Sequence, residues 1–178
     1  MIVELNLCDC LRVFLESRMT DVVLPTRGSN IETPGKSRQL KFIDSYLPIK
    51  NNNSDDPYPF VMVRADSSVA ESEKLQIVVS IIVGTFAADS VGFRDALNVC
   101  SRIRNEILPF TQTPLDQKFQ LLPKIEWDTL TDDQPWPYWQ MGLKTTWAID
   151  FPINKTGGLP NTDGLDDYNE KLKKALYG

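Results

Sequence analysis

The stretch LQIVVSIIVGTF, residues 75–86, decides the fold of this chain. Hydrophobic residues run almost without a break from Ile77 to Val83, which is typical of a central strand covered on both faces of a sheet. The sequence that follows, as far as Pro152, reads as a helix, a strand, a loop rich in proline and aromatic residues, and another strand. The chain is therefore expected to be an α+β protein with a mixed, mostly antiparallel sheet of about four strands.

Three further segments are predicted to extend this sheet. FVMVRAD at residues 60–66 is rich in β-branched residues and indicates a strand before the central one. FQLLPKIEW at residues 119–127 and YWQMGLKTTWAIDF at residues 138–151 are also strand-like. The segment between them is turn-rich and acidic and then becomes aromatic. We expect the last two strands to form a hairpin with a long tip.

Near the N-terminus the sequence has the spacing of an amphipathic helix. Leu7, Leu11, Phe14 and Leu15 share one helical face, and Asn6 is the expected N-cap. This N-terminal helix is expected to pack its apolar face on the sheet.

The main helix is predicted over DSVGFRDALNVCSRIRNEIL, residues 89–108, because its apolar residues keep helical spacing. Ser90 or Asp89 is expected to cap its start, and Pro109 is expected to end it. This helix should also pack on the sheet.

The chain is expected to form one α+β domain over residues 1–153, followed by a linker and a short C-terminal helix over residues 154–178. Within the domain, residues 26–57 are rich in Gly, Pro, Asn, Asp and Ser, which favour turns over regular structure. We predict a long irregular excursion there, with room for one short strand. The C-terminal helix is indicated by apolar residues at helical spacing, which are Leu165, Tyr168, Leu172 and Leu176.

Charge and hydropathy exclude several kinds of partner. The net charge of -5 and the pI near 4.8 disfavour a nucleic-acid binder, because such proteins need clustered Lys and Arg to neutralise phosphates. The longest apolar run is far shorter than the ~20 residues that span a bilayer. No basic region of a signal peptide follows Met1. We therefore expect no sequence-specific nucleic-acid contact and no membrane contact.

The three cysteines are expected to be reduced thiols of a cytosolic protein. Cys8, Cys10 and Cys100 cannot all pair with one another, and a disulfide between Cys8 and Cys10 would close a very tight loop. Cys8 and Cys10 also lack the second Cys or His pair that a closed zinc site requires.

Motifs of catalysis are missing from the sequence. The chain contains no histidine, which excludes nucleophile systems built on Ser, His and Asp or on Cys and His. The acidic pairs Asp55–Asp56 and Asp132–Asp133 lie in loops with proline close by, where turn formation explains them at least as well as cation binding. We expect a protein that is not an enzyme and has no cofactor and no bound metal.

The aromatic residues and irregular segments are the best candidates for an interaction surface. Trp127 and Trp147 lie inside predicted strands and are expected to be core residues. Trp136 and Tyr138 lie in a proline-rich loop, where an interface is an equally good explanation. The candidate assembly interface combines both irregular segments and consists of Asn51, Asn52, Asn53, Asp55, Asp56, Asp132, Asp133, Trp136 and Tyr138.

The order of these elements resembles a known family. A hydrophobic strand ending in VGTF, an acidic turn, the helix GFRDALNVCSRIRNEIL and the segment LLPKIEWDTLTDDQPWPYWQMGLKTTWAIDFP are together similar to the tail terminator (tail completion) proteins of long-tailed bacteriophages and prophages. The resemblance covers residues 60–152, about half of the chain, and includes the D-x-Q-P-x-P-Y-W loop at residues 132–139.

The resemblance implies a fold, a function and a set of partners. Members of this family have a mixed β-sheet flanked by helices and form a ring, often a hexamer, that caps the tail tube. The implied partners are further copies of the chain, the major tail (tube) protein and the head-tail connector. The implied location is the virion tail, which is assembled in the cytoplasm of the bacterial host. The family supplies no catalytic residues.

Two alternatives are compatible with the sequence. The chain resembles other head-tail joining proteins and minor tail proteins in size, and binding at the connector instead of the tube end would identify one of these. A small-ligand or carbohydrate-binding module that uses the tryptophans is the more distant alternative. Changes of tryptophan fluorescence on adding sugars or nucleotides would support it.

Overall fold

The fold is α+β, as the sequence predicts. The structure is a computed structural model and describes residues 2–28, 35–47, 56–71, 73–87, 89, 91–130 and 136–150. Within these ranges the chain forms a five-stranded sheet, a separate two-stranded sheet and two α-helices. The predicted C-terminal helix, and everything else beyond residue 150, lies outside the described residues.

Along the described part of the chain, five strands separate the two helices. The helices are α1 (Val3–Arg18) and α2 (Val91–Ile107), and a 3-10 turn, η1 (Leu108–Thr111), follows the second. The strands are β1 (Val23–Leu24), β2 (Arg38–Gln39), β3 (Lys41–Asp44), β4 (Phe60–Glu71), β5 (Lys74–Phe86), β6 (Gln120–Thr129) and β7 (Tyr138–Asp150).

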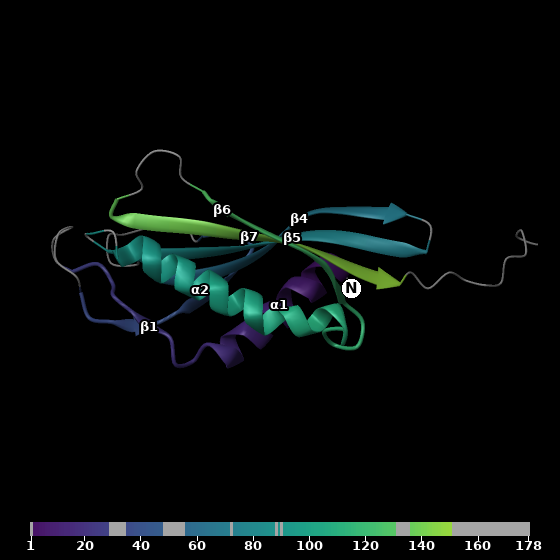
Figure 1. Ribbon diagram of the computed structural model, residues 1–178, viewed down its shortest axis with the longest axis horizontal. Helices are drawn as coiled ribbons and strands as arrows, with labels where there is room; N and C mark the ends of the chain where they lie inside the picture. Colours follow the sequence, from purple (N-terminus) through teal and green to yellow (C-terminus); the bar gives the residue numbers. More distant parts are fainter. Residues whose placement is uncertain are drawn as a thin grey trace, which may run out of the picture.

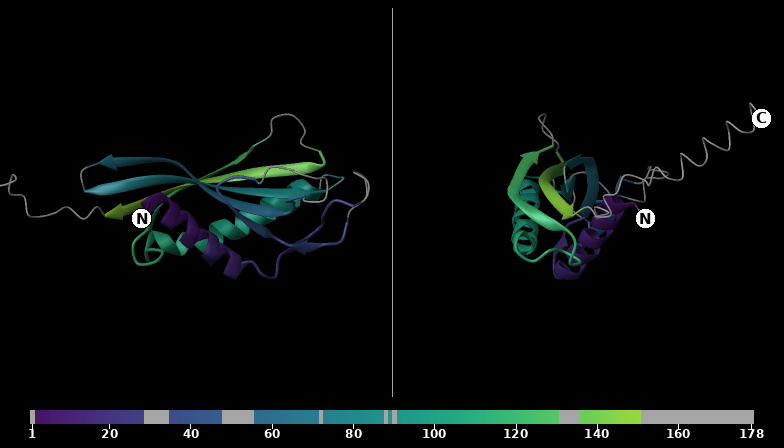
Figure 2. Two further views of the ribbon diagram at one scale, coloured as in Figure 1. Left: turned by 180° about the vertical axis from the view of Figure 1, so that it is seen from behind. Right: turned by 90° about the vertical axis from the view of Figure 1, so that its right-hand side faces the viewer.

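Strand β5 is the centre of the large sheet. The strand order is β3-β4-β5-β7-β6, in which β3 runs parallel to β4 and every other neighbouring pair is antiparallel. Figure 1 and Figure 2 show both helices on one face of this sheet, with α1 beneath β3 and β4 and α2 beneath β5 and β7. In the described part of the chain no helix covers the other face.

Alternate residues of β5 are buried on opposite faces, as predicted for a central strand. Ile77, Val79, Ile81 and Val83 belong to the main core with the apolar faces of α1 and α2. On the other face, Ile82 and Phe86 pack in a second cluster with Ile43, Tyr58, Phe60 and Met62. This second cluster occupies one end of the face without helices.

Gly84 allows the second cluster to close over β5. The ring of Phe60 lies against the Cα of Gly84, where a Cβ atom would overlap the ring. A glycine inside a strand often marks such a close approach of another group. Gly84 is paired with both neighbouring strands, opposite Phe60 on β4 and Gln140 on β7.

The excursion over residues 26–57 contains more regular structure than the sequence predicted. Strands β2 and β3 both lie within it, and β2 pairs with β1 while β3 pairs with β4. The prediction of about four strands is wrong for the same reason, because β3 is the fifth strand of the large sheet. Its four residues are stabilised by pairing with β4, and they lack a strong pattern of their own.

The N-terminus of α2 is capped by a predicted residue, whereas the N-cap predicted for α1 is wrong. Helix α1 begins at Val3, so Asn6 lies inside the helix and the prediction that it is the N-cap is wrong. Its backbone N–H donates to the carbonyl of Ile2 at 3.2 Å, because the apolar stripe continues one turn earlier to Val3. At α2, the carboxylate of Asp89 accepts a hydrogen bond from the backbone N–H of Val91 at 3.0 Å.

The two strand tryptophans have opposite environments. Trp147 is completely buried, as predicted, and its indole N–H donates to the hydroxyl of Thr145 at 2.9 Å. The prediction that Trp127 is a core residue is wrong, since its side chain is 51% exposed. Trp127 lies on β6, which is the outermost strand of the sheet and has only β7 as a neighbour.

We predict that replacing each tryptophan by alanine separates these environments. Trp147→Ala removes a buried side chain from the main core and should lower the free energy of unfolding by roughly 3–5 kcal/mol. Trp127→Ala, its matched control in the same hairpin, should cost much less because its ring is half in solvent. Urea unfolding of both variants checks this, and similar losses would contradict the assignment of Trp127 to the surface.

Two of the three thiols lie in the core. None of the three cysteines forms a disulfide with a described residue. Burial raises the pKa of Cys8 from its ordinary value of 9.0 to about 11, and burial raises that of Cys100 to about 12. Cys10 is only half-buried, and its pKa is also raised by burial. The neutral thiol is therefore the form that the folded core accepts.

These thiols predict a loss of stability at alkaline pH. An acid whose pKa is raised by folding ionises first in the unfolded chain, so its stabilisation is complete below pH 9.0 and is lost as pH rises through about 11 for Cys8 and about 12 for Cys100. The urea midpoint should fall over this range. The control variant Cys8→Ala/Cys100→Ala should show a smaller fall, and an equal fall in both proteins would contradict the role of the thiols.

Candidate assembly interface

Three of the nine predicted interface residues are described by the structure. They are Asp56, Trp136 and Tyr138. The six others lie outside the described residues, and they are Asn51, Asn52, Asn53, Asp55, Asp132 and Asp133.

The structure brings Asp56 and Tyr138 together, although they are 82 positions apart in the sequence. The hydroxyl of Tyr138 donates to the Asp56 carboxylate at 3.2 Å, and a guanidinium nitrogen of Arg27 donates to the same hydroxyl at 3.2 Å. Arg38 donates to the backbone carbonyls of Asp56, at 2.7 Å, and Tyr58, at 2.6 Å. These hydrogen bonds connect the end of the excursion to the start of β7.

Aromatic rings hold this junction on the sheet. The Tyr138 ring lies 4.7 Å from that of Tyr58 and 5.5 Å from that of Phe86, measured between ring centres. Burial raises the pKa of the Tyr58 and Tyr138 phenols, and the Asp56 carboxylate raises both further. Both phenols are therefore neutral hydrogen-bonding groups at neutral pH. Tyr138 is half-buried and joins two segments, whereas Trp136 is 47% exposed.

A hollow of about 280 Å³ adjoins the junction. Its lining is formed by Thr26, Arg27, Lys36, Ser37, Arg38, Asp56 and Tyr58. Three of these residues are basic and one is acidic, so the hollow is locally positive in a chain whose net charge is -5. Positive surface of this kind favours acidic side chains of a partner.

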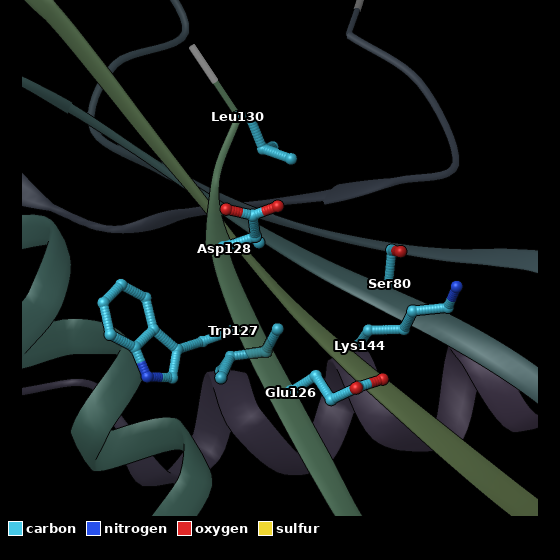
Figure 3. Close-up of a pocket in the computed structure, with 8 residues that line it drawn as sticks. Ser80, Glu126, Trp127, Asp128, Leu130 and Lys144 are labelled. Atoms are coloured by element: carbon cyan, nitrogen blue, oxygen red, sulfur yellow. The ribbon is translucent and has the colours of Figure 1, made fainter. Parts of the chain in front are cut away.

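A second hollow, of about 400 Å³, lies on the β6 side of the sheet (Figure 3). Its lining is formed by Ser80, Glu126, Trp127, Asp128, Leu130, Gly142, Leu143 and Lys144. Leu130 lies over Gly142, where an added Cβ would come within 3.2 Å of the leucine side chain. In Figure 3 the indole of Trp127 points away from the carboxylate of Asp128 and toward a helix.

Sequence reasoning missed several exposed apolar side chains at the margins of the sheet. They include Trp127 and Leu130 near β6, and Tyr46, which follows β3. The acidic residues on both sides of Trp127 in the sequence, Glu126 and Asp128, are a sign of a solvent-facing strand. For Tyr46 the sequence offers no comparable signal.

The described residues offer few groups for other chemistry. Among them, no group of three or more His, Cys, Asp or Glu side chains could hold a metal ion. Neither of the described helices has the length and apolar character required to cross a membrane. Hydrogen bonding, aromatic contact and charge pairing are what this surface provides.

The sequence matches no protein-family model, and a search of curated proteins finds no significant relative.

We predict that Tyr138 stabilises the contact between the end of the excursion and the start of β7. Tyr138→Phe keeps the ring contacts but removes the hydroxyl, so it should lower the free energy of unfolding by about 0.5–1.5 kcal/mol. Tyr138→Ala also removes the contacts with Tyr58 and Phe86 and should cost clearly more. Urea unfolding gives both values, and a Tyr138→Ala protein as stable as Tyr138→Phe would contradict the role of the ring.

Proposed function

We propose that this protein is a tail terminator (tail completion) protein of a long-tailed bacteriophage or prophage. In this proposal it forms a ring, a hexamer by analogy with the family it resembles, that caps the tail tube and offers a docking surface to the head-tail connector. Its partners are other copies of itself, the major tail (tube) protein and the connector protein. It is located in the virion tail after assembly in the host cytoplasm, and it has no catalytic role.

The observation that carries the proposal is the junction of Arg27, Asp56 and Tyr138. It gathers the end of the excursion and the base of the β6–β7 loop at one end of the sheet. A subunit that caps a tube needs such an end for its axial partner, separate from the sides that meet its neighbours in the ring. Figure 1 shows these segments at the end of the molecule opposite the turn between β4 and β5.

The character of this end also supports the proposal. Trp136 is exposed and lies two residues before Tyr138, whose hydroxyl accepts a hydrogen bond from Arg27 of the basic hollow. Exposed aromatic and arginine side chains are common anchors of protein interfaces. The chain has a mixed sheet with two helices packed on it, and the resemblance implies a mixed sheet flanked by helices. The axial partner is therefore expected to bury Trp136 and to contact Arg27 and Lys36.

The test replaces Trp136 by alanine and measures tail completion. Purified protein is added to tail tubes and heads, and joined particles are counted by electron microscopy. Trp136→Ala should nearly abolish joining while the melting temperature stays close to that of the wild type, because truncating an anchor residue costs about 2 kcal/mol or more at each contact. Leu108→Ala, an exposed apolar residue on η1, is the matched control and should join normally.

Two results would contradict the proposal. If Trp136→Ala unfolds the protein while joining per folded molecule is unchanged, this end is structural and not an interface. If the wild-type protein decorates isolated connectors but never the end of the tube, it is another kind of head-tail joining protein.

A further inference from the structure

We propose that the C-terminal segment of this chain, residues 165–176, docks as a helix on the outward face of α1. The segment lies outside the described residues, and its sequence predicts a helix with one apolar stripe. An isolated helix shorter than about 12–15 residues is marginal in water, so this one needs a surface to pack on. The inference concerns the chain itself and does not depend on the proposed ring.

Helix α1 has a second apolar stripe on the side opposite its buried face. This outer stripe contains Ile2, which is the N-cap, Leu5 and Val13, whose exposed fractions are 63%, 47% and 56%. Single apolar side chains are common on protein surfaces. These three, however, keep helical spacing and lie on one side of one helix, which is typical of a face that packs against another element.

A hollow of about 420 Å³ adjoins the outer stripe, between α1 and the turn that follows η1. Its lining is formed by Asp9, Cys10, Val13, Phe14, Leu115 and Asp116. Helix α1 and the turn each contribute one carboxylate, and the other lining residues are apolar. The hollow therefore suits an apolar side chain that has cations beside it.

The C-terminal segment has an apolar stripe with the same spacing as the outer stripe. Positions i, i+3, i+7 and i+11 of the segment are Leu165, Tyr168, Leu172 and Leu176. The same positions along α1 are Ile2, Leu5, Asp9 and Val13. A helix parallel to α1 therefore brings the two stripes together along their length, and it places Leu172 and Leu176 at the hollow.

The end of β7 lies toward the start of α1, where such a helix would begin (Figure 1). Glu4, in the first turn of α1, accepts a hydrogen bond from the Ser68 hydroxyl at 2.8 Å. The sheet register places Ser68 in the row of Trp147, shortly before β7 ends at Asp150. The linker of residues 151–164 can span up to roughly 45 Å, about twice the length of α1. The segment can therefore reach the outer stripe of its own chain.

The described side chains around the hollow have an excess of negative charge. Arg12 pairs with two carboxylates, Asp9 at 3.7 Å and Glu16 at 3.5 Å. Lys118 pairs with a third, Asp116, at 2.9 Å. Three carboxylates therefore share two cations, which favours a further cation at this place.

The lysines of the segment supply that cation when the helix runs parallel to α1. Residues 171–176, KLKKAL, contain three lysines and no acidic residue. Lys171 and Lys173 lie on the two sides of Leu172, so a helix with Leu172 in the hollow brings them beside the carboxylates of its two walls. An antiparallel helix would place Asp166 and Asp167 at this level, where they would meet like charges.

The native thiol of Cys10 provides the first test, because it lines the hollow while the two other thiols are buried. The rate at which a maleimide modifies Cys10 in the full chain is measured by mass spectrometry. Leu172→Ala together with Leu176→Ala should raise this rate by about tenfold, because both side chains that cover the hollow are truncated. Glu170→Ala together with Lys174→Ala, the matched control on the opposite side of the segment, should leave the rate unchanged.

Oxidation of paired cysteines tests the course of the helix and the chain that supplies it. Asn6→Cys and Asn169→Cys, introduced together with Cys10→Ser, adjoin the two stripes at the same level and leave both intact. A parallel helix docked on its own chain should form a disulfide rapidly within the monomer. In the control pair, Asn6→Cys with Ala175→Cys, the second thiol lies roughly 9 Å further along the helix and should react at least about tenfold more slowly.

Three results would overturn the inference. Equal maleimide rates in the wild type and the leucine variant would mean that the segment does not cover the hollow. Equal disulfide rates from the two cysteine pairs would exclude the parallel course. Disulfide-linked dimers in place of the monomer product would show that the occupant belongs to a second copy. None of these results affects the tail-joining test, so this inference and the proposed function stand or fall separately.

Discussion

The burial of β5 on both faces is the constraint on which the rest of the structure depends. Its residues facing the helices join the main core, while Ile82 and Phe86 on the other face need their own cover. That cover comes from Phe60 and Tyr58 at the start of β4, with Gly84 making room for the Phe60 ring. Because β5 is the third of five strands, the outer strands are necessarily others, β3 and β6, and the surfaces most open to association lie at these margins.

The same arrangement separates the ends of the sheet from its edges. At one end, the hydrogen bonds of Arg27 and Asp56 to Tyr138 fasten two segments that are distant in the sequence. At the edges, exposed apolar side chains lie near β6, at Trp127 and Leu130, and after β3, at Tyr46. A subunit of a capping ring needs both kinds of surface, since it must contact its neighbours sideways and its tube or connector along the axis.

The elements with strong periodicity could be predicted from the sequence, and those that depend on pairing could not. The run from Ile77 to Val83 identified the central strand, and the spacing of Leu7, Leu11 and Leu15 identified the buried face of α1. The sequence left room for one short strand in the excursion, but the position of β3 and its parallel pairing were not predicted, because its stability comes from β4. The strand-like sequence of β6 did not indicate that this strand is an outer one, so the prediction that Trp127 is a core residue was wrong. The meeting of Asp56 with Tyr138 depends on tertiary structure and has no local signal.

Hydrogen exchange on the free protein and on the protein bound to tail tubes most directly tests the central claim, that the end of the sheet around Trp136 and Tyr138 meets the axial partner. The account predicts that binding slows exchange of backbone amides at residues 35–38 and 138–140, while amides at the turn between β4 and β5 exchange as before. Slower exchange at that turn in place of the Tyr138 end would contradict it.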